Sequence, residues 1–278
     1  MISQDHVAHL PGAESHFASA GPNRIHYVTV GRGRHTLVLV HGWACHLGFW
    51  SEQIPALAEH ARLVLVDLPG HGRSDQPQTD YSMDFLGRAV LAVLRDAQVD
   101  RATVIGHSMG AAALCRLQHH APEKIAGMVS VDGLLCRLPS TPEEIRALTG
   151  GLASSHYLEH ARAFISTFFP VPGTEALRER VTAEMLATPQ HVMRGAMVGM
   201  LDPAQPDWML QKVNAPVIVL NAPTPWWTSE YKKYVQSLSP QADYTLMENT
   251  GHFLMLEKPL EFNVLLREKL RKFGLIPQ

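Results

Sequence analysis

The chain has 278 residues and a net charge of −2; hydrophobic residues make up 46% of it and charged residues 18%. This near-neutral balance argues against a nucleic acid partner, and the apolar content excludes a disordered chain. Three scattered cysteines argue against a disulfide framework or a zinc ribbon. The length fits one large domain, or one domain carrying an insertion.

The sequence pattern predicts neither a membrane span nor a secretory signal. No segment approaches the roughly 18 consecutive apolar residues of a membrane span. Residues 1–15 lack the basic start and apolar run of a secretory signal. Together with the low cysteine content, this favours a cytoplasmic location.

The first predicted elements form an antiparallel hairpin, in which residues 17–20 and 25–30 flank the turn signal Gly21-Pro22-Asn23. Later apolar runs are mostly continuous, as in strands buried on both faces of a parallel sheet. These predicted strands are 36–40, 62–68, 102–105, 127–131, 216–220 and 243–247. Helical periodicity between or after them covers 81–99, 109–120 and 260–273. Alternating strands and helices predict an α/β domain.

The strand rhythm stops between residues 134 and 213. Thr141-Pro142 is a helix-start signature, and helical patterns follow at 157–169, 175–186 and 192–201. We therefore predict a core domain made of residues 1–133 and 214–278, with residues 134–213 inserted as a helical cap. Because this segment is rich in Met and Phe, it suits an adaptable apolar roof over a pocket.

Three short motifs at strand ends carry the predicted chemistry. Gly106-His107-Ser108-Met109-Gly110 lies between a predicted strand and a predicted helix, the context that a G-x-S-x-G nucleophile turn requires. His41-Gly42-Trp43 directly follows another strand, so the backbone amides of Trp43 and Met109 are expected to form an oxyanion hole. Gly251-His252-Phe253 follows the last strand, and a serine nucleophile needs such a histidine as base.

These motifs resemble those of the α/β-hydrolase superfamily, and the likeness spans roughly residues 17–273. The segments Asp67–Asp75 and Gly251–Pro259 are also similar to family segments. The resemblance implies an eight-stranded, mostly parallel sheet, a Ser-His-acid triad and a cap between strands six and seven.

The triad acid departs from the family pattern, which places it a few residues after strand seven. Residues 221–229 contain no acid, and Glu230 comes several residues late. The alternative place is the end of strand six, where Asp132 stands. We expect Asp132 to be the triad acid, with Glu230 as the second candidate and no working acid as the third possibility.

Several residues are expected near the substrate. His41 and His107 flank the motifs, although His41 also suits a purely structural role. The tryptophans Trp226 and Trp227 take the place of the missing acid, and Phe253 follows the catalytic histidine. Trp43 and Trp50 are further aromatic candidates for this pocket.

The expected function is a serine hydrolase acting on carboxylic esters of small to medium, partly hydrophobic alcohols or acids, similar to carboxylesterases and arylesterases. Ser108 would be the nucleophile, with no metal or organic cofactor and no nucleic acid partner. Alternatives on this fold are a C–C bond or lactone hydrolase, a perhydrolase, and a hydrolase-like ligand receptor. A cofactor-free quinolone dioxygenase group also resembles the chain, because its acid follows strand six and its next loop reads P-T-x-P, similar to Pro223-Thr224-Pro225.

Overall fold

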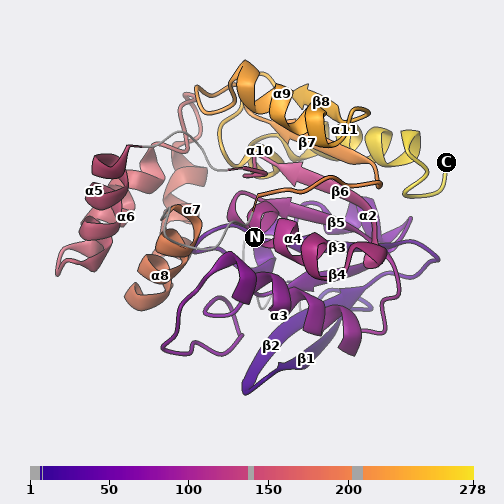
Figure 1. Ribbon diagram of the computed structural model, residues 1–278, viewed down its shortest axis with the longest axis horizontal. Helices are drawn as coiled ribbons and strands as arrows, with labels where there is room; N and C mark the ends of the chain where they lie inside the picture. Colours follow the sequence, from indigo (N-terminus) through magenta and orange to yellow (C-terminus); the bar gives the residue numbers. More distant parts are fainter. Residues whose placement is uncertain (1–6, 8, 137–140, 202–208) are drawn as a thin grey trace.

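The computed structural model describes residues 7, 9–136, 141–201 and 209–278. These residues form one eight-stranded sheet in the order β1-β2-β4-β3-β5-β6-β7-β8 (Figure 1). β1 pairs with β2, and β2 pairs with β4, in antiparallel fashion, whereas the remaining pairs are parallel. The strands are β1 (Glu14–Ala20), β2 (Asn23–Val30), β3 (Thr36–Val40), β4 (Arg62–Val66), β5 (Ala102–His107), β6 (Ile125–Val131), β7 (Val217–Asn221) and β8 (Asp243–Leu246).

Each predicted strand is present: β3 has its predicted bounds, and the others differ at one or both ends. β1 begins at Glu14 rather than at Phe17, because Glu14 pairs with Thr29 at the far end of the hairpin. β4 ends at Val66, two residues before the predicted end at Leu68. The backbone N–H of Leu68 donates to His41 Nε2 at 3.0 Å instead of to a neighbouring strand, so a side chain ends the sheet pairing there.

Helices cover both faces of this sheet. On one face α3 (Met83–Asp96) packs beside α4 (Met109–His120), as Figure 1 shows. The other face carries α2 (Ile54–Ala58) and α11 (Pro259–Lys272), which are linked where Gln53 Nε2 donates to Asn263 Oδ1. Two short helices, α9 (Ser229–Leu238) and α10 (Leu254–Glu257), complete the carboxyl-terminal part.

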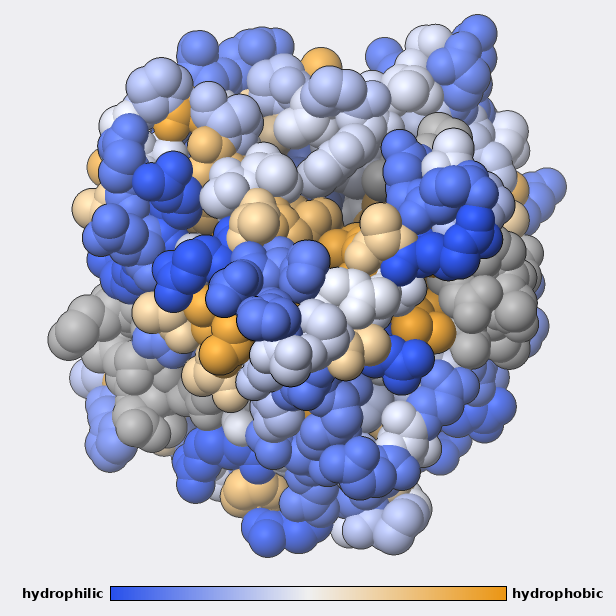
Figure 2. Space-filling model, turned by 90° about the vertical axis from the view of Figure 1, so that its left-hand side faces the viewer, coloured by the Kyte–Doolittle hydropathy of each residue, from blue (hydrophilic) through white to orange (hydrophobic). Residues whose placement is uncertain are grey.

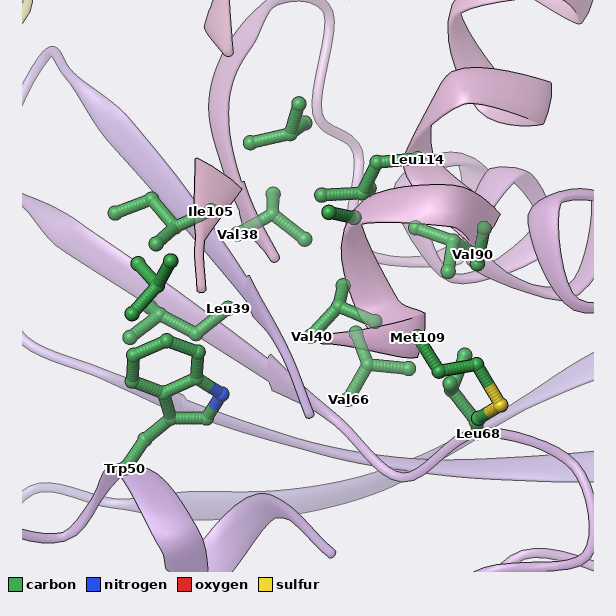
Figure 3. Packing of buried hydrophobic residues seen from close by; sticks show 14 of the residues in the cluster. Val38, Leu39, Val40, Trp50, Val66, Leu68, Val90, Ile105, Met109 and Leu114 are labelled. Carbon is green, nitrogen blue, oxygen red and sulfur yellow. The ribbon is translucent and has the colours of Figure 1, made fainter. Parts of the chain in front are cut away.

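The core lies between the central strands and these two helical layers. Because side chains alternate across a strand, Leu39 points with Ile105 toward Trp50, while Val38 and Val40 point toward α4 (Figure 3). All five side chains are fully buried. The central strands are therefore apolar on both faces, which explains their continuous hydrophobic runs.

The segment between β6 and β7 is helical, as predicted. In the described residues 141–201 it contains α5 (Pro142–Ala153), α6 (Tyr157–Ser166), α7 (Glu175–Leu186) and α8 (Gln190–Leu201), drawn at the left of Figure 1. Thr141 caps α5 in a capping box with Glu144. We call residues 141–201 the helical insertion. Residues 137–140 and 202–208 of the predicted cap lie outside the described residues.

α7 has its predicted bounds, whereas α6 and α8 each differ from the sequence pattern at one end. α6 ends at Ser166 rather than at Phe169, because Pro170 cannot continue the helix and disfavours helical geometry just before it. α8 begins at Gln190, two residues before the predicted start. No helix among the described residues has the length and apolar character needed to cross a membrane.

Candidate active site

Ser108 stands in the sharp turn between β5 and α4. Its backbone adopts φ 53° and ψ −121°, a region that residues other than glycine rarely occupy and that often marks a functional site. Three backbone hydrogen bonds hold this turn: Ser108 N–H donates to Val131 O at 3.1 Å, and Ser108 O accepts from Ala111 N–H at 3.1 Å and from Leu134 N–H at 3.4 Å. The strained turn is therefore anchored both to β6 and to the first turn of α4.

His252 connects Ser108 to Asp132. Its Nε2 lies 2.9 Å from Ser108 Oγ, and its Nδ1 lies 2.6 Å from Asp132 Oδ2. An ionised carboxylate only accepts hydrogen bonds, so Nδ1 carries the proton and donates it. In the neutral imidazole Nε2 is then an acceptor, and it is placed to take the hydroxyl proton of Ser108.

Asp132 directly follows β6 and is completely buried. Its other carboxylate oxygen, Oδ1, accepts the backbone N–H of Ala222 at 2.8 Å and the indole N–H of Trp227 at 2.7 Å. Burying a carboxylate is costly unless it is hydrogen-bonded. Three donors satisfy this one, and only one of them belongs to His252.

Glu230, the second candidate for the acid, lies elsewhere. It stands in the first turn of α9 and is exposed. Hydrogen bonds from its own backbone N–H and from the hydroxyls of Ser229 and Thr228 hold its pKa below the usual value. The structure thus brings Asp132, and not Glu230, to the histidine.

The His41–Trp43 turn contacts the Ser108 turn directly. A Cβ atom at Gly42 would lie 3.0 Å from Ser108 Cβ and 2.9 Å from His107 Nδ1, so a larger residue would push the two turns apart. Met109 is the first residue of α4, and N–H groups in a first helical turn have no intrahelical acceptor. The turns that carry Trp43 and Met109 therefore meet at Ser108, and their backbone N–H groups remain the predicted donors of an oxyanion hole.

The turn after Gly42 is tied to the helical insertion. Side-chain hydrogen bonds connect this turn to the insertion, and each joins residues that are well separated in sequence. Among the described residues they are Trp43 Nε1–H to Met193 O (2.8 Å), Thr188 Oγ1–H to Ala44 O (3.2 Å) and His46 Nε2 with Glu184 Oε2 (3.1 Å). The position of the turn consequently depends on α7 and α8.

His107 and His41 are buried and support the backbone. His107 Nε2–H donates to His252 O at 2.9 Å, and burial lowers the pKa of His107 well below its usual value, so this ring is neutral. His41 Nδ1–H donates to Gly42 O at 2.8 Å, while its Nε2 accepts from Leu68. His41 is fully buried and is not among the residues that line the cavity beside Ser108, which corrects that expectation. Its two ring nitrogens are instead bonded to the backbone of Gly42 and Leu68.

Two buried histidines, His41 and His71 in the loop after β4, make the fold sensitive to acid. Burial lowers the pKa of His41 to about 3 and that of His71 to about 4, whereas the unfolded value is about 6.5. Below pH 6.5 the unfolded chain binds more protons, so the free energy of unfolding falls as the pH drops from about 6.5 to about 4. We expect each histidine to lower the free energy of unfolding by about 1.4 kcal/mol for each pH unit within this range.

Urea unfolding at pH 7.5, 6 and 5 measures this slope. His71 Nδ1–H donates to Pro69 O and its Nε2 accepts from Ala44 N–H, and glutamine retains one donor and one acceptor. His71→Gln should therefore reduce the pH dependence of the free energy of unfolding by about 1.4 kcal/mol per pH unit, the contribution of one proton. An unchanged slope in this variant would show that another group titrates.

A cavity of about 170 Å³ opens beside Ser108. Four of the five residues that the sequence suggested for the pocket, His107, Trp226, Trp227 and Phe253, line it, and so does Trp43. Trp50 is fully buried beneath His107, with ring centroids 6.5 Å apart, and is not a lining residue.

The helical insertion supplies much of the apolar wall. Its lining residues come from all four of its helices and from the turn after α6. They are Leu148, Phe164, Phe168, Met185, Met197, Met200 and Leu201. Figure 2 views the molecule from this side. Hydrophobic residues are visible there among the hydrophilic residues that make up most of this surface.

Two residues that the motifs did not single out hold the His252 loop. Phe168 O accepts the backbone N–H of His252 at 2.9 Å, and the Phe168 ring lies 4.5 Å from the imidazole. A Cβ at Gly251 would lie only 2.4 Å from Phe168 O. Glu257 accepts the backbone N–H groups of Gly251 and Phe253 at 2.7 and 3.2 Å. No sequence signal beyond apolar character marked Phe168, because its contact crosses from the insertion to the core.

Comparison with known proteins agrees with this architecture. The family model described as alpha/beta hydrolase fold matches residues 35–259, so the chain belongs to the α/β-hydrolase family. A pimeloyl-acyl-carrier-protein methyl ester esterase of Nitrosomonas europaea is 28% identical over 86% of this chain and 96% of its own length.

Two further relatives have different names. A 2-hydroxy-6-oxononadienedioate/2-hydroxy-6-oxononatrienedioate hydrolase of Paraburkholderia phymatum is 27% identical over 96% of this chain and 99% of its own. The crystal structure of a bromoperoxidase from Bacillus anthracis superimposes with a TM-score of 0.83 at 22% identity, covering 93% of this chain and all of that one. The names of the sequence relatives support a hydrolase on this fold.

Proposed function

We propose that this protein is a serine hydrolase that cleaves carboxylic esters through an acyl-enzyme on Ser108. The observation that carries the proposal is the hydrogen-bonded line from Ser108 through His252 to Asp132, at the wall of an apolar cavity. A base within hydrogen-bond reach of the hydroxyl, itself oriented by a carboxylate, is the arrangement that activates a serine.

The proposed cycle begins when Ser108 Oγ attacks the ester carbonyl and its proton passes to His252 Nε2. The carbonyl oxygen becomes an oxyanion, which the backbone N–H groups of Trp43 and Met109 stabilise. The imidazolium, paired with Asp132, then protonates the departing alcohol as the C–O bond breaks. Water next gives a proton to His252 Nε2 and attacks the acyl carbon, which forms a second tetrahedral intermediate. When this intermediate collapses, the bond from the acyl carbon to Ser108 Oγ breaks, His252 returns the proton to Oγ, and the acid is released. Every atom and proton balances without a cofactor.

The proposed substrate is a small to medium ester with an apolar or aromatic part. The support is the wall itself, which is lined by Phe164, Phe168, the methionines of the insertion, Trp226 and Trp227. In this proposal the helical insertion acts as a cap, and Met side chains let it adapt to different shapes. The esterase named above acts on a methyl ester, which is consistent with small leaving alcohols.

A panel of p-nitrophenyl esters from acetate to decanoate, with phenyl acetate as an aryl ester, tests the class. We expect sustained turnover, and peptide mass spectrometry after phenylmethylsulfonyl fluoride treatment should find the label on Ser108. A single turnover with the acyl group retained would instead favour a ligand receptor. Absence of both cleavage and labelling would contradict the proposal.

A cofactor-free dioxygenase is the second candidate, favoured by one observation: the carboxylate that meets His252 follows β6. An oxygen electrode with a 3-hydroxy-4-quinolone discriminates between the two. Oxygen uptake without ester cleavage would replace the esterase proposal, whereas the esterase predicts cleavage of the ester panel and no oxygen uptake.

A further inference from the structure

The loop after β7 presents a hydrogen-bond donor to the site. Trp227 belongs to this loop, and its indole N–H donates to Asp132 Oδ1 at 2.7 Å, across 95 positions of sequence. The same oxygen accepts Ala222 N–H at 2.8 Å, while Oδ2 faces His252 Nδ1 at 2.6 Å. The β7 loop thus donates two hydrogen bonds to Oδ1, whereas Oδ2 accepts from His252.

The orientation of Trp227 is determined by its neighbours. Its backbone N–H donates to Thr224 O at 3.2 Å. Thr228, the next residue, caps α9 by accepting Tyr231 N–H. The ring of Tyr231 lies 4.9 Å from the Trp227 ring and is buried. The loop turn, the helix cap and this ring contact together aim the indole N–H at the carboxylate.

We infer that Trp227 is a positioning residue for the catalytic acid: its indole N–H holds the Asp132 carboxylate so that Oδ2 stays directed at His252. The inference rests on the proposed function. A charge-assisted hydrogen bond is strong and directional. Because an unsatisfied buried carboxylate oxygen is costly, a carboxylate that loses one donor is expected to rotate or to take up a proton. Either change weakens the bond that keeps the imidazole in its productive tautomer.

Trp227→Phe removes the N–H and keeps a large ring in the cavity wall. We expect kcat on the best p-nitrophenyl ester to fall about tenfold, equivalent to part of one charge-assisted hydrogen bond, with KM changed less than about twofold. The matched control is Tyr27→Phe on β2, which likewise removes an aromatic side-chain donor to a carboxylate, Asp96 Oδ2 at 2.6 Å, but neither residue lines the cavity. Its kcat should stay within about twofold of the unmodified protein.

A double-mutant cycle separates positioning from simple packing. In an Asp132→Asn background there is no carboxylate to hold, so adding Trp227→Phe should cost less than about twofold. Trp227→Leu is run in the same cycle as a second variant without the N–H, and circular dichroism melts check that each variant is folded.

The outcomes are distinct. Equal losses from Trp227→Phe in both backgrounds, or no loss in the unmodified background, would overturn the role of Trp227 and leave the proposed hydrolase intact. Full turnover by Asp132→Asn alone would overturn Asp132 as the acid, and the role of Trp227 with it. A loss confined to the background that contains Asp132 supports the inference.

Discussion

Replacing Ser108 with alanine is expected to lower kcat about 10⁶-fold for the best ester substrate, as losing the nucleophile does in serine hydrolases of this type. No acyl-enzyme can form without Oγ, and His252 then has no hydroxyl to deprotonate. The oxyanion site and the cavity remain, so activity about 10³-fold above the uncatalysed rate should survive. Stopped-flow and long-time absorbance measurements of p-nitrophenol release cover this range.

Ser130→Ala is the matched control for this substitution. Ser130 is a fully buried serine on β6, and its hydroxyl donates to Gly133 O at 3.0 Å without contacting the cavity. We expect it to lower stability by about 1 kcal/mol and to leave kcat nearly unchanged. If Ser108→Ala retained substantial turnover while unlabelled by phenylmethylsulfonyl fluoride, another nucleophile would have to be sought.

The second large effect is expected for Asp132→Asn, which should lower kcat about 10⁴-fold. The amide of asparagine can donate to His252 Nδ1, and this would hold the imidazole in the tautomer whose Nε2 carries the proton. That tautomer cannot accept the proton of Ser108. The loss should appear in kcat rather than in KM, because Asp132 acts through the histidine and not on the bound ester.

Glu230→Gln is the control, because Glu230 is the other acid that sequence considerations allowed. It is exposed on α9, and its Oε1 accepts a hydrogen bond from Ser229 Oγ at 3.0 Å. We expect activity within about twofold of the unmodified protein. The reverse pattern, an active Asp132→Asn and an inactive Glu230→Gln, would transfer the acid role to Glu230.

The strand and turn signals were strong enough to predict the succession of strands and helices along the chain and the local surroundings of Ser108 and His252. Each of these residues directly follows a strand or its turn, so its place depends on local patterns a few residues long. The catalytic roles of both residues stay predictions until the variants are measured. The pairing of Asp132 with His252 was less determined, since two acids lay at plausible points along the chain.

What local pattern could not predict is which side chains meet across the fold. His41 was expected at the pocket, but its ring nitrogens are bonded to Gly42 and Leu68. Trp227 was expected only as a wall residue, and its bond to Asp132 depends on how the loop between β7 and α9 runs. Phe168 reaches His252 from the insertion, at a distance that no motif encodes.

The sequence by itself determined that this is an apolar, nearly neutral α/β chain with a sharp serine turn between a strand and a helix, a histidine segment and a helical insertion. These features follow from composition, from hydrophobic period and from residues required by a sharp turn, all of which act locally. Only the tertiary structure decided that Asp132 meets His252, that Glu230 stays at the surface and that the insertion walls the cavity. Those contacts depend on parallel strands bringing their carboxyl ends to one edge of the sheet, where distant loops become neighbours.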